Sequence, residues 1–265
     1  MKEKKGSGVR QVLANVLEVV FIYFVFMIAA GAIRSFLGAD SSDAEYLSVS
    51  LANVVLCIVL PLVVKKKLDR SIRESLCFRK VKPLDVVMAF FAVYSIPRLL
   101  MHLEGILLSD RMTIKSAEDD ERTVIFFLAA VIIGPIAEEI FFRYAIMEQM
   151  KEKIPRWIVV ILASAFFALL HGYNVQGLTC MFIFFVISSV FYERESNLAY
   201  TIILHIFYNL VVYVLDAKMF DPFWEIASRT NNGFIIYRPL GLLLLLILAV
   251  ISIVYFSFYS KEGDS

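Results

Sequence analysis

Cysteine and histidine are scarce in this chain, which contains only three of each among 265 residues. Cys57, Cys77 and Cys180 are widely separated and form no Cys-x-x-Cys pair. Their odd number argues against a disulfide framework, so we interpret them as packing residues. The histidines are unevenly distributed, because His171 and His205 both lie inside apolar segments.

Charged residues are also few, at 19% of the chain, whereas 60% of it is hydrophobic. Several apolar runs approach the roughly 20 residues that a helix needs to cross a bilayer. Because lipid offers no partners to exposed backbone polar groups, each run is expected to be helical. The sequence therefore predicts an all-α, polytopic integral membrane protein with about eight transmembrane helices, at residues 11–33, 47–64, 84–108, 123–147, 157–173, 177–192, 198–215 and 240–259. The segment 177–192 is short for a span, which favours a tilted or partly re-entrant placement.

The basic residues orient this array of helices. With the N-terminus inside, 17 of the 26 Lys and Arg residues fall in inner segments and seven in outer segments. This bias satisfies the positive-inside rule and predicts that both termini are cytoplasmic. The inner segment 65–82 is the most basic and is suited to contact anionic lipid headgroups. Arg98 lies within a span near its outer end, and we interpret it as reaching toward the interface.

We divide the chain into three parts. Residues 1–119 hold the first three transmembrane helices, residues 120–215 hold the core helices with the ionisable motifs, and residues 216–265 hold an outer loop and the last helix. We expect the protein to reside in the cell (plasma) membrane.

Two adjacent carboxylates and an arginine occur inside the fourth apolar segment, at Glu138, Glu139 and Arg143. Ionisable side chains at membrane depth cost about 2.5–3.5 kcal/mol each on insertion scales, so they are rare there unless they pair or function. On a helix, Glu139 and Arg143 share a face and are predicted to pair, whereas Glu138 points about 100° away and remains available. Pro135 removes a backbone hydrogen bond just upstream and is predicted to kink the helix.

Two further apolar segments carry the imidazoles. Phe167 precedes His171 by four residues, and His205 precedes Asn209 by four, so each pair shares a helix face. Imidazole can act as a base, a donor or a metal ligand, and an amide can donate to a developing oxyanion. Together with Glu138, these groups suit the activation of a water molecule for attack on a peptide carbonyl.

The three patterns Glu-Glu-x-x-x-Arg, Phe-x-x-x-His and His-x-x-x-Asn, in this order on successive membrane helices, resemble the CAAX protease and bacteriocin-processing family, also called CPBP or ABI. The resemblance covers residues 120–215 and implies an intramembrane endopeptidase. It implies that Glu138 activates water with help from His171, and that His205 and Asn209 form the oxyanion hole. Glu139 and Arg143 would hold their helix in register. Tyr144 departs from the glycine found in many members and would narrow the cavity.

The resemblance leaves two sources of the activated water open. One is a zinc ion held by Glu138, His171 and His205, and the other is glutamate-activated water without any cofactor. Zinc sites are usually recognised by closer ligand spacing than these residues show. The sequence also lacks the His-Glu-x-x-His, Gly-x-Gly-Asp and Gly-x-Ser-x-Gly motifs of other membrane peptidases.

Other functions compete with this interpretation. The expected partners are a membrane-associated or lipid-modified peptide or protein substrate and the lipid bilayer, and no nucleic acid. One alternative is a non-catalytic bacteriocin-immunity or regulatory protein that binds another membrane protein. A small-solute transporter is a weaker alternative, because only one proline-interrupted span lies near the buried charges.

Overall fold

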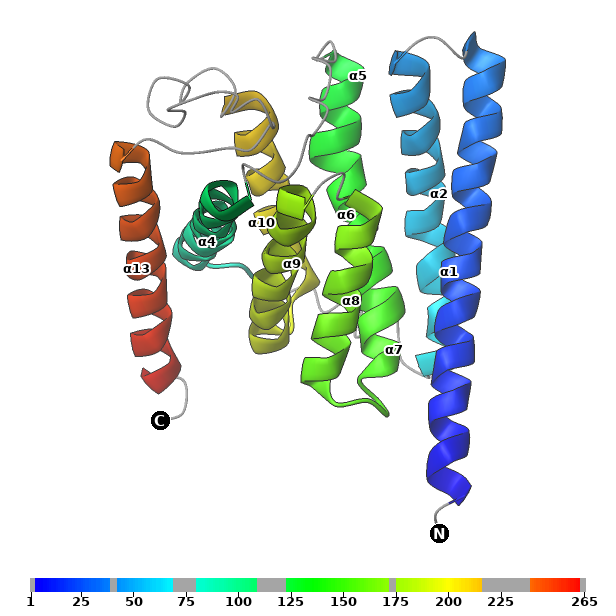
Figure 1. Ribbon diagram of the computed structural model, residues 1–265. Coiled ribbons are helices and arrows are strands. Elements are labelled where there is room, and N and C mark those ends of the chain that lie inside the picture. The colour runs from blue at the N-terminus through cyan, green and yellow to red at the C-terminus, as the bar shows by residue number, and fades with distance from the viewer. Residues whose placement is uncertain are drawn as a thin grey trace. The chain divides into compact units, whose positions relative to one another are not determined.

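Helices account for all regular elements in the part of the chain that the structure, a computed structural model, describes, namely residues 3–38, 42–68, 80–108, 123–171, 175–215 and 239–262 (Figure 1). This confirms the predicted all-α class. The predicted domain boundaries lie in or beside segments outside the described residues, as do Cys77 and most of the basic segment 65–82. The three-part division therefore stays a prediction.

Within the described ranges, six helices are long and apolar enough to cross a membrane, which shows an integral membrane protein. They lie in α1 (Glu3–Gly38), α2 (Ser42–Leu68), α4 (Pro83–Leu108), the composite helix Val124–Met150, α9 (Val175–Glu195) and α13 (Pro239–Glu262). Two shorter apolar helices, α8 (Arg156–His171) and the stretch Leu198–Tyr213, coincide with the remaining two predicted segments. The segment 177–192 is longer than expected, because α9 extends it at both ends to 21 residues.

The chain forms two compact units. Unit 1 comprises Met1–Lys80, Asp119–Ala163 and Tyr192–Ile206, and unit 2 comprises Val81–Glu118, Ser164–Phe191 and Phe207–Ser265. The helices α8, α9 and α10 (Leu198–Leu210) each contribute residues to both units.

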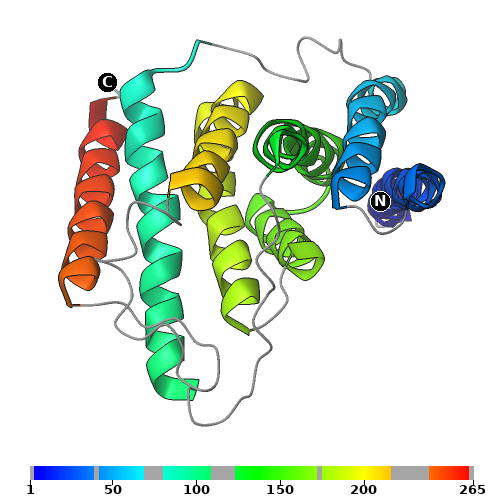
Figure 2. The same ribbon diagram turned by 90° about the horizontal axis from the view of Figure 1, so that it is seen from above.

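In unit 1, α1 and α2 lie side by side along much of their length (Figures 1 and 2). An ion pair of 2.6 Å joins Lys67 Nζ on α2 to Glu18 Oε2 on α1. The Tyr23 ring of α1 stacks on the Phe141 ring with centroids 4.4 Å apart. These contacts attach the α1–α2 pair to the composite helix that carries the first motif.

The composite helix is not a regular α-helix. Its parts are α5 (Val124–Phe127), the π-helix η1 (Leu128–Ile133), α6 (Gly134–Glu139), the π-helix η2 (Ile140–Met147) and α7 (Glu148–Met150). The disturbance predicted at Pro135 thus takes the form of π-helical turns on both sides of α6. Pro135 has no N–H, so one backbone hydrogen bond of the helix is missing at this residue. In the wider turn of η1, the N–H of the preceding residue, Gly134, bonds to the carbonyl of Ala129, five residues back.

Gly134 is required by this close approach. A Cβ atom at Gly134 would lie 2.8 Å from the Ala129 carbonyl oxygen, which is closer than real side chains pack. Glu138 follows one turn later, so the backbone of this turn positions the carboxylate of Glu138.

In unit 2, α4 packs along α13 (Figures 1 and 2). Ser252 donates a hydrogen bond of 2.7 Å to the Met88 carbonyl, and the Tyr255 hydroxyl donates one of 2.6 Å to Asp85. These bonds join the two helices across their interface.

The interpretation of Arg98 as an interfacial residue was wrong, since this side chain is buried within unit 2. Its guanidinium lies 3.7 Å from the ring centroid of Tyr94 and 5.7 Å from that of Tyr208. It also donates a hydrogen bond of 3.1 Å to the Tyr94 carbonyl. Two aromatic faces and a carbonyl stabilise the guanidinium inside the protein, so the Arg98 side chain does not have to extend to the membrane interface.

Candidate active site

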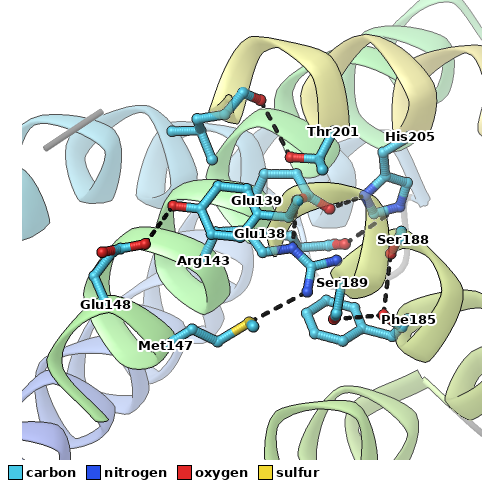
Figure 3. A network of polar contacts seen from close by, with 12 residues as sticks. Glu138, Glu139, Arg143, Met147, Glu148, Phe185, Ser188, Ser189, Thr201 and His205 are labelled. Carbon is cyan, nitrogen blue, oxygen red and sulfur yellow. Dashed lines mark hydrogen bonds and ion pairs between the residues drawn. The ribbon is translucent and has the colours of Figure 1, made fainter. Parts of the chain in front are cut away.

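The predicted pair in the first motif is present and fully buried. Glu139 Oε2 accepts a hydrogen bond of 3.0 Å from Arg143 Nε, and both side chains have 0% exposure (Figure 3). Their spacing places both on one face of the composite helix. A charge at such depth is tolerated only when it is paired and hydrogen-bonded.

Arg143 has further contacts that hold its guanidinium in place. One of its terminal nitrogens contacts Met147 Sδ at 3.3 Å, and the guanidinium carbon lies 6.0 Å from the ring centroid of Tyr192. The Tyr192 hydroxyl in turn donates a hydrogen bond of 2.8 Å to Glu148. These groups anchor one end of the buried ion pair.

His205 lies beside both glutamates. Its Nδ1 is 3.1 Å from Glu139 Oε1, and its Nε2 is 3.7 Å from Glu138 Oε2 (Figure 3). The His205 side chain is 5% exposed and that of Glu138 is 23% exposed, whereas Glu139 is inaccessible. Glu138 is therefore the more accessible of the two carboxylates, as the sequence predicted from its position on the helix.

The partner of His205 Nδ1 determines which ring nitrogen carries the proton in this contact. An ionised carboxylate only accepts hydrogen bonds, so Nδ1 carries the proton in this contact and Nε2 is turned toward Glu138. The Thr201 hydroxyl, which donates to the Leu198 carbonyl at 3.2 Å, also interacts with Glu139. Glu139 is thus held by its hydrogen bonds to Arg143 and His205.

The second motif has its own local geometry in unit 2. His171 Nδ1 donates a hydrogen bond of 2.9 Å to the Phe167 carbonyl, one turn earlier on α8. The two rings stack with centroids 4.2 Å apart and an interplanar angle of 23°. Phe167 also stacks on Phe185 of α9, with centroids 4.5 Å apart. The spacing Phe-x-x-x-His therefore supplies both a hydrogen-bond acceptor and a stacking surface for the imidazole.

The structure brings four of the six predicted site residues together in unit 1: Glu138, Glu139, Arg143 and His205. His171 and Asn209 belong to unit 2. Asn209 is half-buried and lies one turn after His205 on α10. The catalytic roles assigned to these six residues remain predictions.

Sequence reasoning missed three contributors to the network. Thr201 is four residues before His205 on α10, so the helical period alone would have placed it on the same face. Tyr192 and Glu148 come from different helices, and no sequence signal joins them to the motif.

The predicted zinc ligands are only partly tested by this geometry. Among the described residues, no group of three or more His, Cys, Asp or Glu side chains is arranged to hold a metal ion. Within unit 1, both oxygens of Glu139 and Nδ1 of His205 are already hydrogen-bonded. Glu138 and His205 Nε2 thus supply two donors of the predicted set, while the third, His171, belongs to unit 2. The zinc assignment stays a prediction.

Tyr144 does not point into the network. Its ring is fully buried, and its hydroxyl donates a hydrogen bond of 3.5 Å to the Pro61 carbonyl of α2. Tyr144 thus contacts α2, and the narrowing of the cavity stays a prediction.

Fold and site together define an all-α integral membrane protein with carboxylates, a guanidinium and an imidazole buried among its apolar helices. Residues 120–211 match the model of the Rce1-like family, described as type II CAAX prenyl endopeptidase Rce1-like. This match contains all three motifs and confirms the predicted resemblance of this segment to the CAAX protease family.

A protein of Mycoplasma capricolum subsp. capricolum, described as uncharacterised, is 33% identical to the chain over 97 residues. That alignment covers 35% of this chain and 27% of the Mycoplasma protein, so the chain spans about a quarter of that relative's length. No solved structure matches the chain. The matched family is one of endopeptidases, and none of these comparisons supports the bacteriocin-immunity alternative.

Proposed function

We propose that the protein is an intramembrane endopeptidase that hydrolyses a peptide bond in a membrane-associated or lipid-modified peptide. The observation that carries the proposal is the buried network in which Glu138 and Glu139 flank His205. This network lies in the segment that matches the CAAX endopeptidase family. We further propose that the protein resides in the plasma membrane.

In the proposed reaction, Glu138 accepts a proton from a water molecule that attacks the peptide carbonyl. Its partial exposure beside buried neighbours supports this role, because a base must reach its substrate. His171 assists through Nε2. Its Nδ1–H bond to a carbonyl fixes the neutral tautomer with the lone pair on Nε2, the form needed to accept a hydrogen bond from water.

His205 has a different role in this proposal. Two carboxylates and one guanidinium leave one negative charge in the cluster, and an imidazole carrying both ring protons balances it. In that form Nε2–H is a donor, and with the Asn209 amide it stabilises the oxyanion of the tetrahedral intermediate. The different partners of the two imidazoles, a backbone carbonyl and a carboxylate, support the different roles.

The test compares the purified wild type with Glu138→Gln on a quenched fluorescent peptide library in nanodiscs. Loss of the general base is expected to reduce cleavage by about 10²–10⁴-fold. Glu104→Gln is the matched control, since Glu104 also lies within a span but bonds Thr179 in unit 2. Undiminished cleavage by Glu138→Gln, with the variant folded, would overturn the assignment.

A chelator added to the same assay addresses the cofactor. Cleavage that persists with chelator supports water activated by Glu138 and His171 alone. Cleavage that is lost with chelator and restored by zinc supports the ligand set Glu138, His171 and His205.

A further inference from the structure

A groove with one charged end lies between α1 and α2, away from the candidate active site. Its volume is about 290 Å³. It is lined by three apolar side chains and three charged ones, namely Val59, Leu62, Val63, Glu18, Lys66 and Lys67. A groove with apolar side chains and a cluster of charged ones suits an amphiphile, that is, a molecule with a hydrocarbon chain and a charged group.

The charged end has an excess of positive charge. Lys67 Nζ pairs with Glu18 at 2.6 Å and donates to the Asn15 carbonyl at 3.5 Å, so this lysine neutralises the only carboxylate among the lining residues. Lys66 lines the groove, Lys65 precedes it on α2 outside the lining residues, and both are exposed. Two ammonium groups are therefore available beside the groove for an anion.

The apolar end extends along α2 toward the middle of the span. Val59 precedes Lys66 by seven residues, which is about 10 Å along a helix. Leu62 is 52% exposed at the groove, so its side chain is accessible to a hydrocarbon chain. One molecule with an anionic group and a hydrocarbon chain could thus contact Lys66 and Val59 at the same time.

We propose that this groove is a binding site for an anionic phospholipid. The phosphate lies at Lys65 and Lys66, and one acyl chain lies along Val59, Leu62 and Val63. Basic pockets between transmembrane helices bind anionic headgroups in this way, and the positive-inside rule puts these lysines at the cytoplasmic leaflet. The inference is independent of the proposed peptidase activity and uses none of its residues.

The experiment incorporates the full-length protein into nanodiscs of phosphatidylcholine, alone or mixed with an equal amount of phosphatidylglycerol. The lipids that remain bound after gentle extraction are then counted by native mass spectrometry. The wild type is expected to retain phosphatidylglycerol in preference to phosphatidylcholine. Lys66→Gln is expected to lower that preference about fivefold, and Lys65→Gln/Lys66→Gln about 25-fold, since each basic residue near the surface contributes a similar factor.

Two variants separate the groove from general surface charge. Lys80→Gln removes an exposed lysine from the same basic segment but outside the groove, and it is expected to retain the wild-type preference. Val63→Trp fills the apolar part and is expected to lose bound phosphatidylglycerol with all lysines intact. Circular dichroism and the melting temperature in phosphatidylcholine verify that each variant is folded.

Three outcomes would overturn the proposal. The first is an unchanged lipid preference in the double lysine variant, and the second is an equal loss in Lys80→Gln. The third is displacement of the lipid by glycerol phosphate at equal concentration, which would indicate a site for the free phosphate compound and no role for the acyl chain. Activity of the enzyme does not enter any of these measurements.

Discussion

Phe167 holds His171 in two ways at once: its backbone carbonyl accepts the Nδ1–H bond at 2.9 Å, and its ring stacks on the imidazole at 4.2 Å. The carbonyl would survive any substitution at this position, whereas the ring would not. The two contributions can therefore be separated by mutation.

Phe167→Leu is expected to reduce kcat about tenfold with little change in KM. The reason is that a stacked aromatic pair contributes about 0.5–1.5 kcal/mol beyond its buried area, and this energy orients His171. Steady-state kinetics on the peptide identified with the wild type measure both constants. Phe182→Leu, a half-buried phenylalanine on α9, is the control and should leave kcat within twofold. An equal fall in kcat for both variants would contradict the positioning role of Phe167.

The buried ion pair leads to a stability prediction. Arg143→Met alone leaves Glu139 as a buried carboxylate without its guanidinium partner, and it is expected to lower the free energy of unfolding by about 3–5 kcal/mol. The double variant Glu139→Gln/Arg143→Met should recover most of that loss, because no unbalanced charge remains. Denaturant unfolding in mild detergent measures both values.

The exposed pair Arg34–Glu45 provides the comparison for this experiment. Its nitrogen and oxygen are 2.8 Å apart, but the two side chains are 40% and 48% exposed. Arg34→Met is therefore expected to cost less than about 1 kcal/mol. Similar losses from Arg34→Met and Arg143→Met would show that burial does not determine the contribution of the inner pair.

Gly134→Ala is expected to destabilise the protein by about 1–3 kcal/mol and to reduce cleavage. The added methyl group would lie 2.8 Å from the Ala129 carbonyl, so the backbone that carries Glu138 must shift. Gly31→Ala is the matched helical control, because nothing lies within 4 Å of a Cβ atom at that position. It should be neutral or stabilise the helix by up to about 1 kcal/mol. A melting temperature and a cleavage rate that are unaffected by Gly134→Ala would contradict the requirement for glycine.

Local patterns predicted a large part of this molecule because their physical basis is local. Apolar runs long enough to cross a bilayer identified the helices, and the four-residue spacing of Glu139 and Arg143 identified their ion pair. The exposure of Glu138 relative to Glu139 also followed from the 100° rotation between neighbouring residues on a helix.

The features that escaped prediction depend on tertiary neighbours. The burial of Arg98 requires the faces of Tyr94 and Tyr208, and Tyr208 lies on a helix more than a hundred residues away. The bond from His205 to Glu139 likewise joins two helices whose register no period of the sequence specifies. Pro135 predicted a disturbance, but whether a kink or a π-helical turn results depends on the packing around Ala129 and Gly134.

The π-helical turn of η1 has a consequence for how this segment tolerates changes in length. A π-turn is equivalent to an α-helix with one extra residue, so a single deletion within Leu128–Ile133 would let the helix close into regular α-geometry. Everything downstream would keep its orientation, and Glu139 would stay on the face on which it meets His205, whereas a deletion in the regular turns of α6 would rotate the following residues by about 100°. The loss of one residue should therefore be tolerated better in η1 than in α6.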